Sequence, residues 1–244
     1  MKRSTFRNLG WFILSLTIWG PGRLNAQPSK ASEPSVQQVN EWIASCQKNV
    51  EGGRYAQALP SCQAVLSLAE RTMSPDDQRV ALWSANVGRV LWDLGRFIEA
   101  EPLIRRSLRI YEKAMGAEHR DVAALLNELA ELYRAQGKYV EAEPLYRRSL
   151  QILEKVLGAE HPNVASSLNN LAALYHAQGK YGEAEPLFRR SLQIRERVLG
   201  AEHPDVAQSL HNLAALHRAQ GKDGEAEPLY RRSLQIYEKA RFGD

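Results

Sequence analysis

Three histidines occur at a regular spacing and could together hold a metal ion. His119, His161 and His203 each follow a glutamate, and successive members of the series are 42 residues apart. Imidazole is a common ligand of Zn²⁺, which holds its nitrogen ligands at about 2.0–2.1 Å. Whether three such side chains can converge on one ion depends on the elements that carry them.

Paired arginines recur at the same spacing and could form a basic stripe for an acidic partner. Each pair opens an Arg-Arg-Ser-Leu segment, and nearby glutamates such as Glu141 and Glu143 lie within helical reach. Because exposed pairs of opposite charge are common on helices, we expect mutual ion pairs rather than an open basic stripe. The pairs are Arg105/Arg106, Arg147/Arg148, Arg189/Arg190 and Arg231/Arg232.

The familiar catalytic and nucleotide-binding motifs do not occur in the sequence. It has no phosphate loop, no Gly-x-Ser-x-Gly, no His-Glu-x-x-His and no Cys-x-x-Cys. An enzyme needs acids, bases or metal ligands that converge on one point. We therefore expect no catalysis and no cofactor.

A repeat of 42 residues organises almost the whole chain and must position these side chains. Residues 158–199 and 200–241 are identical at 31 of 42 positions. Weaker copies precede them, so the unit occurs five times and the first copy is the most degenerate. Five glycines mark the period, namely Gly53, Gly95, Gly137, Gly179 and Gly221.

Each unit has the apolar pattern of two helices. In the fourth unit, apolar residues recur at i, i+3, i+4 and i+7 from Leu168 to Tyr175, which indicates a helix over 164–177. Gly179 can end this helix because glycine tolerates positive φ, and a second helix is predicted over 181–199. Stacked pairs bury both kinds of face, so the sequence predicts an all-α solenoid, a right-handed superhelix of antiparallel helix pairs with one concave wall.

This arrangement argues against a metal site shared by the histidines. Packed helices lie about 10 Å apart, and equivalent histidines are separated by two helices. Three imidazoles placed in this way cannot reach one ion, so we predict no metal site. We expect the Glu-His-Pro segments to shape the links between units instead.

The segment LNNLAALYHAQGKYGEAEPLFRRSL, residues 168–192, resembles a tetratricopeptide repeat. It has the small contact residue, the Tyr before the turn, then Gly, Tyr, Ala and an aromatic residue. The usual unit has 34 residues, and this longer form is similar to the repeats of kinesin light chain. The resemblance covers residues 36–241 and implies a scaffold that binds a protein or peptide partner on its concave wall.

Candidate binding residues lie on the outward face of the predicted first helices. Asn86, Asn170 and Asn212 are equivalent, and Glu128 interrupts their series. In the family that the chain resembles, asparagines at such places hold the backbone of an extended peptide, since an amide both donates and accepts. Hydrogen bonds within the wall are the alternative. The full candidate set is Asn86, Arg89, Asn127, Glu128, Glu131, Arg134, Asn169, Asn170, His176, His211, Asn212 and Arg218.

Both cysteines, Cys46 and Cys62, fall in the first unit. In an exported protein an even pair suggests a disulfide, and the alternative is two buried thiols. The two side chains would lean toward each other, but an offset of about one turn would strain the usual Cα separation of about 5.5–6 Å. A bond closing this 16-residue loop would contribute about 3 kcal/mol.

Residues 1–26 have the features of a secretory signal peptide. A basic start precedes the apolar run 9–20, and Leu-Asn-Ala before Gln27 offers a cleavage site. The run is shorter than the about 20 residues that a membrane helix needs; the alternatives are an uncleaved anchor and a buried core helix. Residues 27–35 are predicted to form a flexible linker. We therefore predict export to the periplasm or the medium, with membrane anchoring as the alternative.

The charge distribution argues against a nucleic-acid partner. The net charge of +4 lies in residues 1–26, which contain four basic residues and no acidic one. The rest of the chain contains 28 basic and 28 acidic residues. No excess of basic residues is left there to neutralise phosphates.

The last unit differs from the inner copies. His217 and Asp223 replace tyrosines, as is usual in a terminal repeat. Leu229, Leu234 and Ile236 are expected to form an exposed apolar edge. Either the last helix tolerates this edge, or two chains pair weakly end to end.

These features together predict a non-catalytic interaction scaffold that binds a protein or peptide on its concave wall. The alternative is a passive spacer in a cell-envelope assembly, which would act through its ends or by self-association. The predicted organisation is a signal peptide at 1–26, a linker at 27–35 and a solenoid at 36–244 of five helix pairs, at about 36–73, 74–115, 116–157, 158–199 and 200–241.

Overall fold

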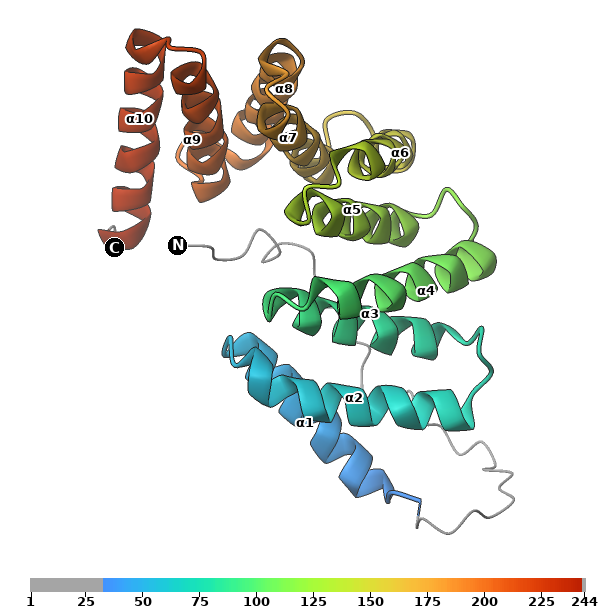
Figure 1. Cartoon of the computed structure of the whole chain (residues 1–244). Helices are drawn as coiled ribbons and strands as arrows, with labels where there is room; N and C mark the ends of the chain where they lie inside the picture. The colour runs from blue at the N-terminus through green and yellow to red at the C-terminus, as the bar shows by residue number, and fades with distance from the viewer. Residues whose placement is uncertain (1–32, 243–244) are drawn as a thin grey trace.

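The computed structural model describes residues 33–242, which form ten helices and contain no strand. Successive helices pack as five pairs that follow a curved path (Figure 1). The predicted signal peptide and most of the predicted linker lie outside the described residues. The helices are α1 (Val36–Glu51), α2 (Tyr55–Thr72), α3 (Gln78–Asp93), α4 (Phe97–Met115), α5 (Arg120–Ala135), α6 (Tyr139–Leu157), α7 (Pro162–Ala177), α8 (Tyr181–Leu199), α9 (Pro204–Ala219) and α10 (Asp223–Phe242).

The first helices of the pairs line the inner side of the curve. α5 contacts α7, and α7 contacts α9, although a second helix separates each of these pairs along the chain. Figure 1 shows α3, α5 and α7 toward the hollow of the arc, with α4 and α6 outside them. The curvature therefore brings equivalent side chains of successive first helices close together.

Histidine begins three of the first helices. The Nδ1 atoms of His119, His161 and His203 accept hydrogen bonds from the backbone N–H two residues later, at 3.2, 3.1 and 3.1 Å. Each bond satisfies one of the N–H groups that a helix start leaves without a partner. The Glu-His links therefore act as helix caps, and Asp121 and Asp205 follow as first-turn acids.

A glycine in the left-handed region reverses the chain within each pair. At the end of α5, Gly137 has φ 74°, and the next residue, Lys138, donates its N–H to the carbonyl of Tyr133 at 2.9 Å. A side chain would strain this conformation. The same reversal recurs at the equivalent glycines, which explains the 42-residue glycine period.

The core is continuous through four pairs and partly separate in the fifth. Small residues such as Ala130 and Ala172 are fully buried where paired helices meet. In each of the last three pairs, a serine of the second helix donates its hydroxyl to a carbonyl of the first helix at 2.7 Å. Val206, Ala207, Leu210 and Ile236 form an apolar cluster of their own in the fifth pair.

Cys46 and Cys62 are joined by a disulfide that ties α1 to α2. Their Cα atoms are 5.2 Å apart, which lies within the usual range. The expected offset of one turn therefore does not lengthen the Cα separation. The bond compensates for the polar residues Ser45 and Asn49, which lie near it on α1 at partly buried positions.

The arginine pairs of the second helices are engaged in ion pairs, as predicted. The first arginine of each pair binds a glutamate four residues earlier, as in Arg147–Glu143 at 3.0 Å. The second binds a glutamate of the preceding pair, as in Arg190–Glu154 at 2.6 Å. These arginines therefore link neighbouring pairs instead of forming an open basic stripe.

Candidate functional site

The candidate wall is formed by one face of α3, α5, α7 and α9, and much of it is less open than predicted. Asn170, His211, Asn212 and Arg218 are partly or well exposed. Asn86, Asn127, Glu128, Glu131 and Asn169 are buried, with Asn86 8% and Glu128 2% exposed. The expectation that all twelve residues point outward was wrong for these five, because the inner radius of the curve brings neighbouring first helices into contact.

Amide side chains connect α5, α7 and α9 in a ladder. Asn170 donates its Nδ2 to Oδ1 of Asn127 on the preceding first helix at 3.2 Å. Asn212 does the same to Asn169 at 2.8 Å. The partly exposed amide of each step thus binds the buried amide of the previous helix. The hydrogen bonds within the wall that the sequence left as an alternative are present.

The outer amides of the ladder keep unused hydrogen-bonding capacity. An asparagine amide offers two N–H donors and a carbonyl with two lone pairs, and Asn170 uses one donor in the ladder. Asn212 also accepts from Gln208 at 3.1 Å, a residue that the sequence did not single out. Ala173 and Ala215 follow the two asparagines by one helical turn. Both alanines have small side chains and are partly exposed.

An ion pair replaces the ladder between α3 and α5. Arg89 donates from Nε and Nη2 to the same Oε1 of Glu128, at 2.9 and 2.7 Å, and from Nη1 to Asn86 at 3.1 Å. Oε2 of Glu128 is buried and has no hydrogen-bond partner among residues 33–242. The carboxylate that interrupts the asparagine series is therefore held by the arginine of the preceding pair.

A second polar cluster lies at the C-terminal end of α5. Glu131 binds Arg134 at 2.7 Å and accepts a hydrogen bond from the hydroxyl of Tyr146 on α6. Burial, together with the neighbouring Glu131 carboxylate, holds the pKa of Tyr146 well above its ordinary value of 10. Tyr146 recurs as Phe188 and Tyr230 in the next two pairs, and this pattern of large residues gives no sign of the bond.

The joint between the fourth and fifth pairs contains a buried arginine without a carboxylate hydrogen-bond partner among the described residues. Arg195 of α8 is 8% exposed and donates to the carbonyl of Asp205 at 3.0 Å and to the hydroxyl of Ser209 at 2.9 Å. Burial lowers its pKa from the ordinary value. The equivalent residues of α4 and α6 are Tyr111 and Leu153, so comparing the copies could have identified this exception.

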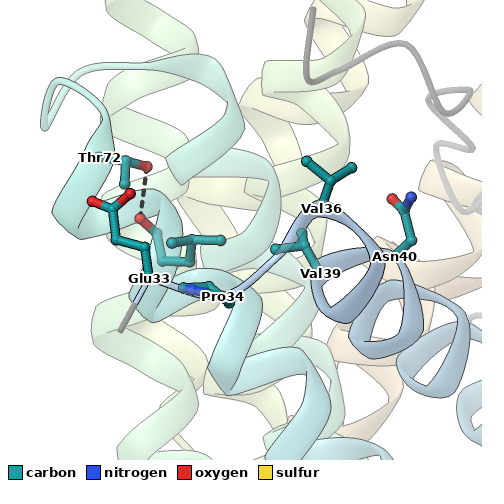
Figure 2. A pocket seen from close by; sticks show the side chains of 7 residues that line it. Glu33, Pro34, Val36, Val39, Asn40 and Thr72 are labelled. Carbon is teal, nitrogen blue, oxygen red and sulfur yellow. Dashed lines mark hydrogen bonds between the residues drawn. The ribbon is translucent and has the colours of Figure 1, made fainter. Parts of the chain in front are cut away.

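Two hollows lie away from the amide ladder. One, of about 60 Å³, lies at the start of α1 and is lined by Pro34, Val39 and Thr72 among others (Figure 2). That volume is far below the range of small-molecule sites. The other, of about 320 Å³, is an open depression between α6 and α8 over Leu171 and Tyr175. That volume is at the low end for small-molecule sites.

No group of three or more His, Cys, Asp or Glu side chains within residues 33–242 is arranged to hold a metal ion. None of the ten helices is both long and apolar enough to cross a membrane.

Comparison with solved structures places the fold among repeat proteins of one kind. A Podosopora anserina protein described as kinesin light chain nearly identical TPR-like repeats is 26% identical, with a TM-score of 0.70 over 84% of this chain and 97% of that chain. BtubC from P. vanneervenii is 24% identical, with a TM-score of 0.71 over 85% and 83%. Aspartyl phosphate phosphatase F from Bacillus subtilis is 14% identical and shares the fold, with a TM-score of 0.70 over 85% of this chain and 53% of its own.

The family assignment comes from the sequence models. No curated protein matches the chain significantly. A family model described as Tetratricopeptide repeat matches residues 50–113, 121–196 and 166–239. A second model of the same description matches residues 86–155. With most of its length matched and its helix pairs stacked as in the solved relatives, the chain belongs to the tetratricopeptide repeat family.

Proposed function

We propose that this protein is a non-catalytic interaction scaffold that binds an extended peptide or protein segment along α5, α7 and α9. The observation that supports this proposal best is the amide ladder. Its outer members, Asn170 and Asn212, are fixed by bonds of 3.2 and 2.8 Å and keep donors and acceptors for a ligand. A pre-oriented amide loses little conformational freedom when it binds a peptide backbone.

The binding segment would be short, because an ion pair replaces the amide ladder between α3 and α5. Arg89 binds Glu128 and Asn86, and Glu128 is buried, so neither side chain of this pair is open to a ligand as Asn170 and Asn212 are. Beyond them, Trp92 occupies the place of Arg134 and His176. The proposed ligand therefore lies along α5, α7 and α9, with the exposed amides Asn170 on α7 and Asn212 on α9, whereas Glu128 occupies their place on α5.

The absence of catalysis is part of this proposal. Enzymes bring an acid, a base or a metal together within hydrogen-bonding reach of one reacting atom. The wall instead repeats one amide at intervals of a whole unit, and its buried carboxylates are tied to Arg89, Arg134 and Tyr146. Such a surface suits recognition of a repeated backbone.

The test is an affinity capture from envelope and secreted fractions with the full chain as bait. We would compare the parent with the Asn170→Ala/Asn212→Ala variant. The matched control is Gln151→Ala/Gln193→Ala, which removes two exposed amides from equivalent places on α6 and α8. All three chains must show the same helical circular dichroism.

A partner retained by the parent and the control but lost by the double asparagine variant would support binding on the wall. Equal retention by all three chains would overturn it and move the interaction to the ends or to the outer face. The same preparation would give the mass of the chain.

We also propose that the protein is exported. The supporting features are the signal-like sequence of residues 1–26 and the disulfide between Cys46 and Cys62, which persists in oxidising compartments. Mass spectrometry of the protein from its native cells would test the proposal. A new amino terminus at Gln27 would support export with cleavage, and retention of Met1 in the cytosolic fraction would contradict it.

A spacer that acts through its ends is the second candidate. It is favoured by one observation, the exposed apolar side chains of α10, with Leu234 57% exposed. Substitutions in the amide ladder would leave such a function intact, so the capture experiment separates the two candidates.

A further inference from the structure

Every second helix carries an apolar stripe that receives the first helix of the next pair. On α8 the stripe consists of Phe188 and Leu192, and Leu192 packs against the core of the fifth pair. The equivalent leucine of α4, Leu108, is 9% exposed. On α10 the equivalent residues are Tyr230, whose ring centroid lies 5.2 Å from that of His211 on α9, and Leu234, which is 57% exposed. Tyr237, one turn further along α10, is 40% exposed.

The exposed edge differs from the sequence prediction at two of its three residues. Ile236 is buried against α9, because it occupies the place of the buried Ile194, and Leu229 is partly buried and packs against the core. Tyr237 was not predicted to be exposed; it is 40% exposed, with its hydroxyl 3.5 Å from Oε1 of Gln208 on α9. Among the described helices, α9 packs against α10, and no helix covers the face of α10 that carries Leu234.

The opposite end of the molecule has been made polar at the corresponding positions. Inner first helices bury apolar residues or serine where the preceding pair covers them, as α3 does with Val80, Trp83, Val87 and Val90. The equivalent residues of α1 are Gln38, Glu41, Ser45 and Lys48, of which all but the partly buried Ser45 are exposed. Stacking α10 of one copy on α1 of another would bury these polar groups without partners, at a high cost in free energy.

We infer that the open face of α10 pairs with the same face of a second copy, as two antiparallel α10 helices related by a twofold axis near Leu234. A twofold contact uses one surface twice and closes on itself, whereas head-to-tail stacking would give open chains. This inference is independent of the proposed function of the wall, which lies on other helices.

The charges of α10 suit an antiparallel arrangement. Glu227 lies seven residues before Leu234, and Arg241 lies seven residues after it, so both fall near the stripe. When two helices cross antiparallel at Leu234, Glu227 of each copy, which also binds Arg231 of its own helix at 2.5 Å, comes opposite Arg241 of the other. A parallel arrangement would place like charges together, which disfavours it.

The first test is sedimentation of the full chain from about 1 µM to about 1 mM, a range that resolves weak association. The parent should form dimers, and Leu234→Arg should raise the dimer Kd by about a hundredfold or more, because each dimer contains the substitution twice. The control is Gln235→Arg on the exposed neighbouring position, which should leave Kd within about threefold. All chains must keep the same helical circular dichroism.

A parent that stays monomeric throughout, or dimers that resist Leu234→Arg, would overturn the inference. Dimers that resist Leu234→Arg would mean that two copies associate through another segment of the chain. Oxidative cross-linking gives an independent check, because both native cysteines are bonded to each other. Leu234→Cys should cross-link two copies quickly at low concentration, and Gln235→Cys should do so far more slowly. Equal rates for the two variants would contradict a twofold axis near Leu234.

Discussion

The joint between the second and third helix pairs and the joint between the fourth and fifth pairs each contain a buried or half-buried arginine, held in opposite ways. Arg89 faces Glu128 and binds one of its oxygens twice. Arg195 is more deeply buried and binds a carbonyl and two serine hydroxyls. One joint therefore contains a matched ion pair, and the other contains an arginine that is hydrogen-bonded to neutral oxygens, with the charge of Asp205 acting on it as well.

The comparison shows how one repeat can produce a firm joint and a weak one. A buried carboxylate needs its cation, so Arg89 and Glu128 hold α3 and α5 together. Arg195 occupies a place where α6 has Leu153, and the apolar cluster of the fifth pair is separate from the main core. The burial of Arg195 costs free energy that the charge of Asp205 offsets only in part, so we expect the fifth pair to be the least firmly attached of the last four.

The largest effect is expected for Arg89→Ala. The substitution leaves Glu128 buried without its cation and should lower the free energy of unfolding by about 3–5 kcal/mol, measured by urea titration of the full chain. The control is Arg197→Ala, which removes an arginine from the exposed Arg197–Glu160 pair at 2.8 Å. It should change the free energy of unfolding by about 0.5 kcal/mol or less. A loss no larger than the control's would refute the structural role of the Arg89–Glu128 pair.

Adding Glu128→Asn to Arg89→Ala sharpens the same experiment. The double variant carries the residue types of Ala173 and Asn170, so it leaves no buried charge in the joint, although the place of the ladder acceptor Asn127 is Ala85 on α3. We expect it to recover most of the stability lost by the single variant. If the double variant is as unstable as Arg89→Ala, the loss comes from something other than the uncompensated carboxylate.

Arg195→Leu is expected to have the next largest effect, with the opposite sign. It restores the residue type of Leu153 and joins the two apolar clusters, so the free energy of unfolding should rise by about 2 kcal/mol. Backbone hydrogen exchange in α9 and α10 should become slower in the same variant. The control Arg197→Leu, on the same helix but exposed, should leave both quantities nearly unchanged. A loss of stability in Arg195→Leu would show that the serine and carbonyl contacts outweigh the burial of charge.

A smaller loss is expected within the ladder. Asn212→Ala removes the donor to Asn169, whose carbonyl is buried, and should lower the free energy of unfolding by about 1 kcal/mol. Gln193→Ala, an exposed amide on α8, is the control and should be nearly neutral. If Asn212→Ala were also neutral, the ladder would be held by packing, and its amides would be more available to a ligand than we propose.

The smallest effect is expected at the start of α7. His161→Ala removes the cap of α7 and should cost about 0.5–1 kcal/mol, while His161→Asp should retain the stability because aspartate is a strong cap. Thermal unfolding would compare the two variants. Equal losses in both would mean that the ring packs rather than caps.

The 42-residue period was sufficient to predict the helix pairs, since it combines a 3.6-residue apolar pattern with one glycine turn per pair. The helix bounds follow it closely, as at α8, which was expected over 181–199 and is Tyr181–Leu199. The histidine caps could not be predicted in the same way, because histidine is not among the residues that commonly begin helices. The period identified the Glu-His segments as links between units, but it did not reveal the hydrogen bond that each histidine accepts from the start of the next helix.

The candidate wall was predicted less completely, for a geometric reason. Periodicity identifies the face of a helix but not the radius of the superhelix. The radius decides whether Asn127 and Asn169 meet solvent or the next helix. Contacts between residues of different pairs, such as Arg89 with Glu128, depend on the same radius. The sequence therefore indicated which residues share the wall, and the structure was needed to show which of them are already occupied.

The serine bond inside each of the last three pairs has a mechanical consequence. The bonds from Ser149, Ser191 and Ser233 clasp each second helix to its own first helix at 2.7 Å, while the joints between pairs differ. Under tension applied to its two ends, the molecule should yield in whole pairs, each releasing about 140 Å of contour. The joint at Arg195 should give way first, and the disulfide at the opposite end should keep its 16-residue loop closed and shorten the last step.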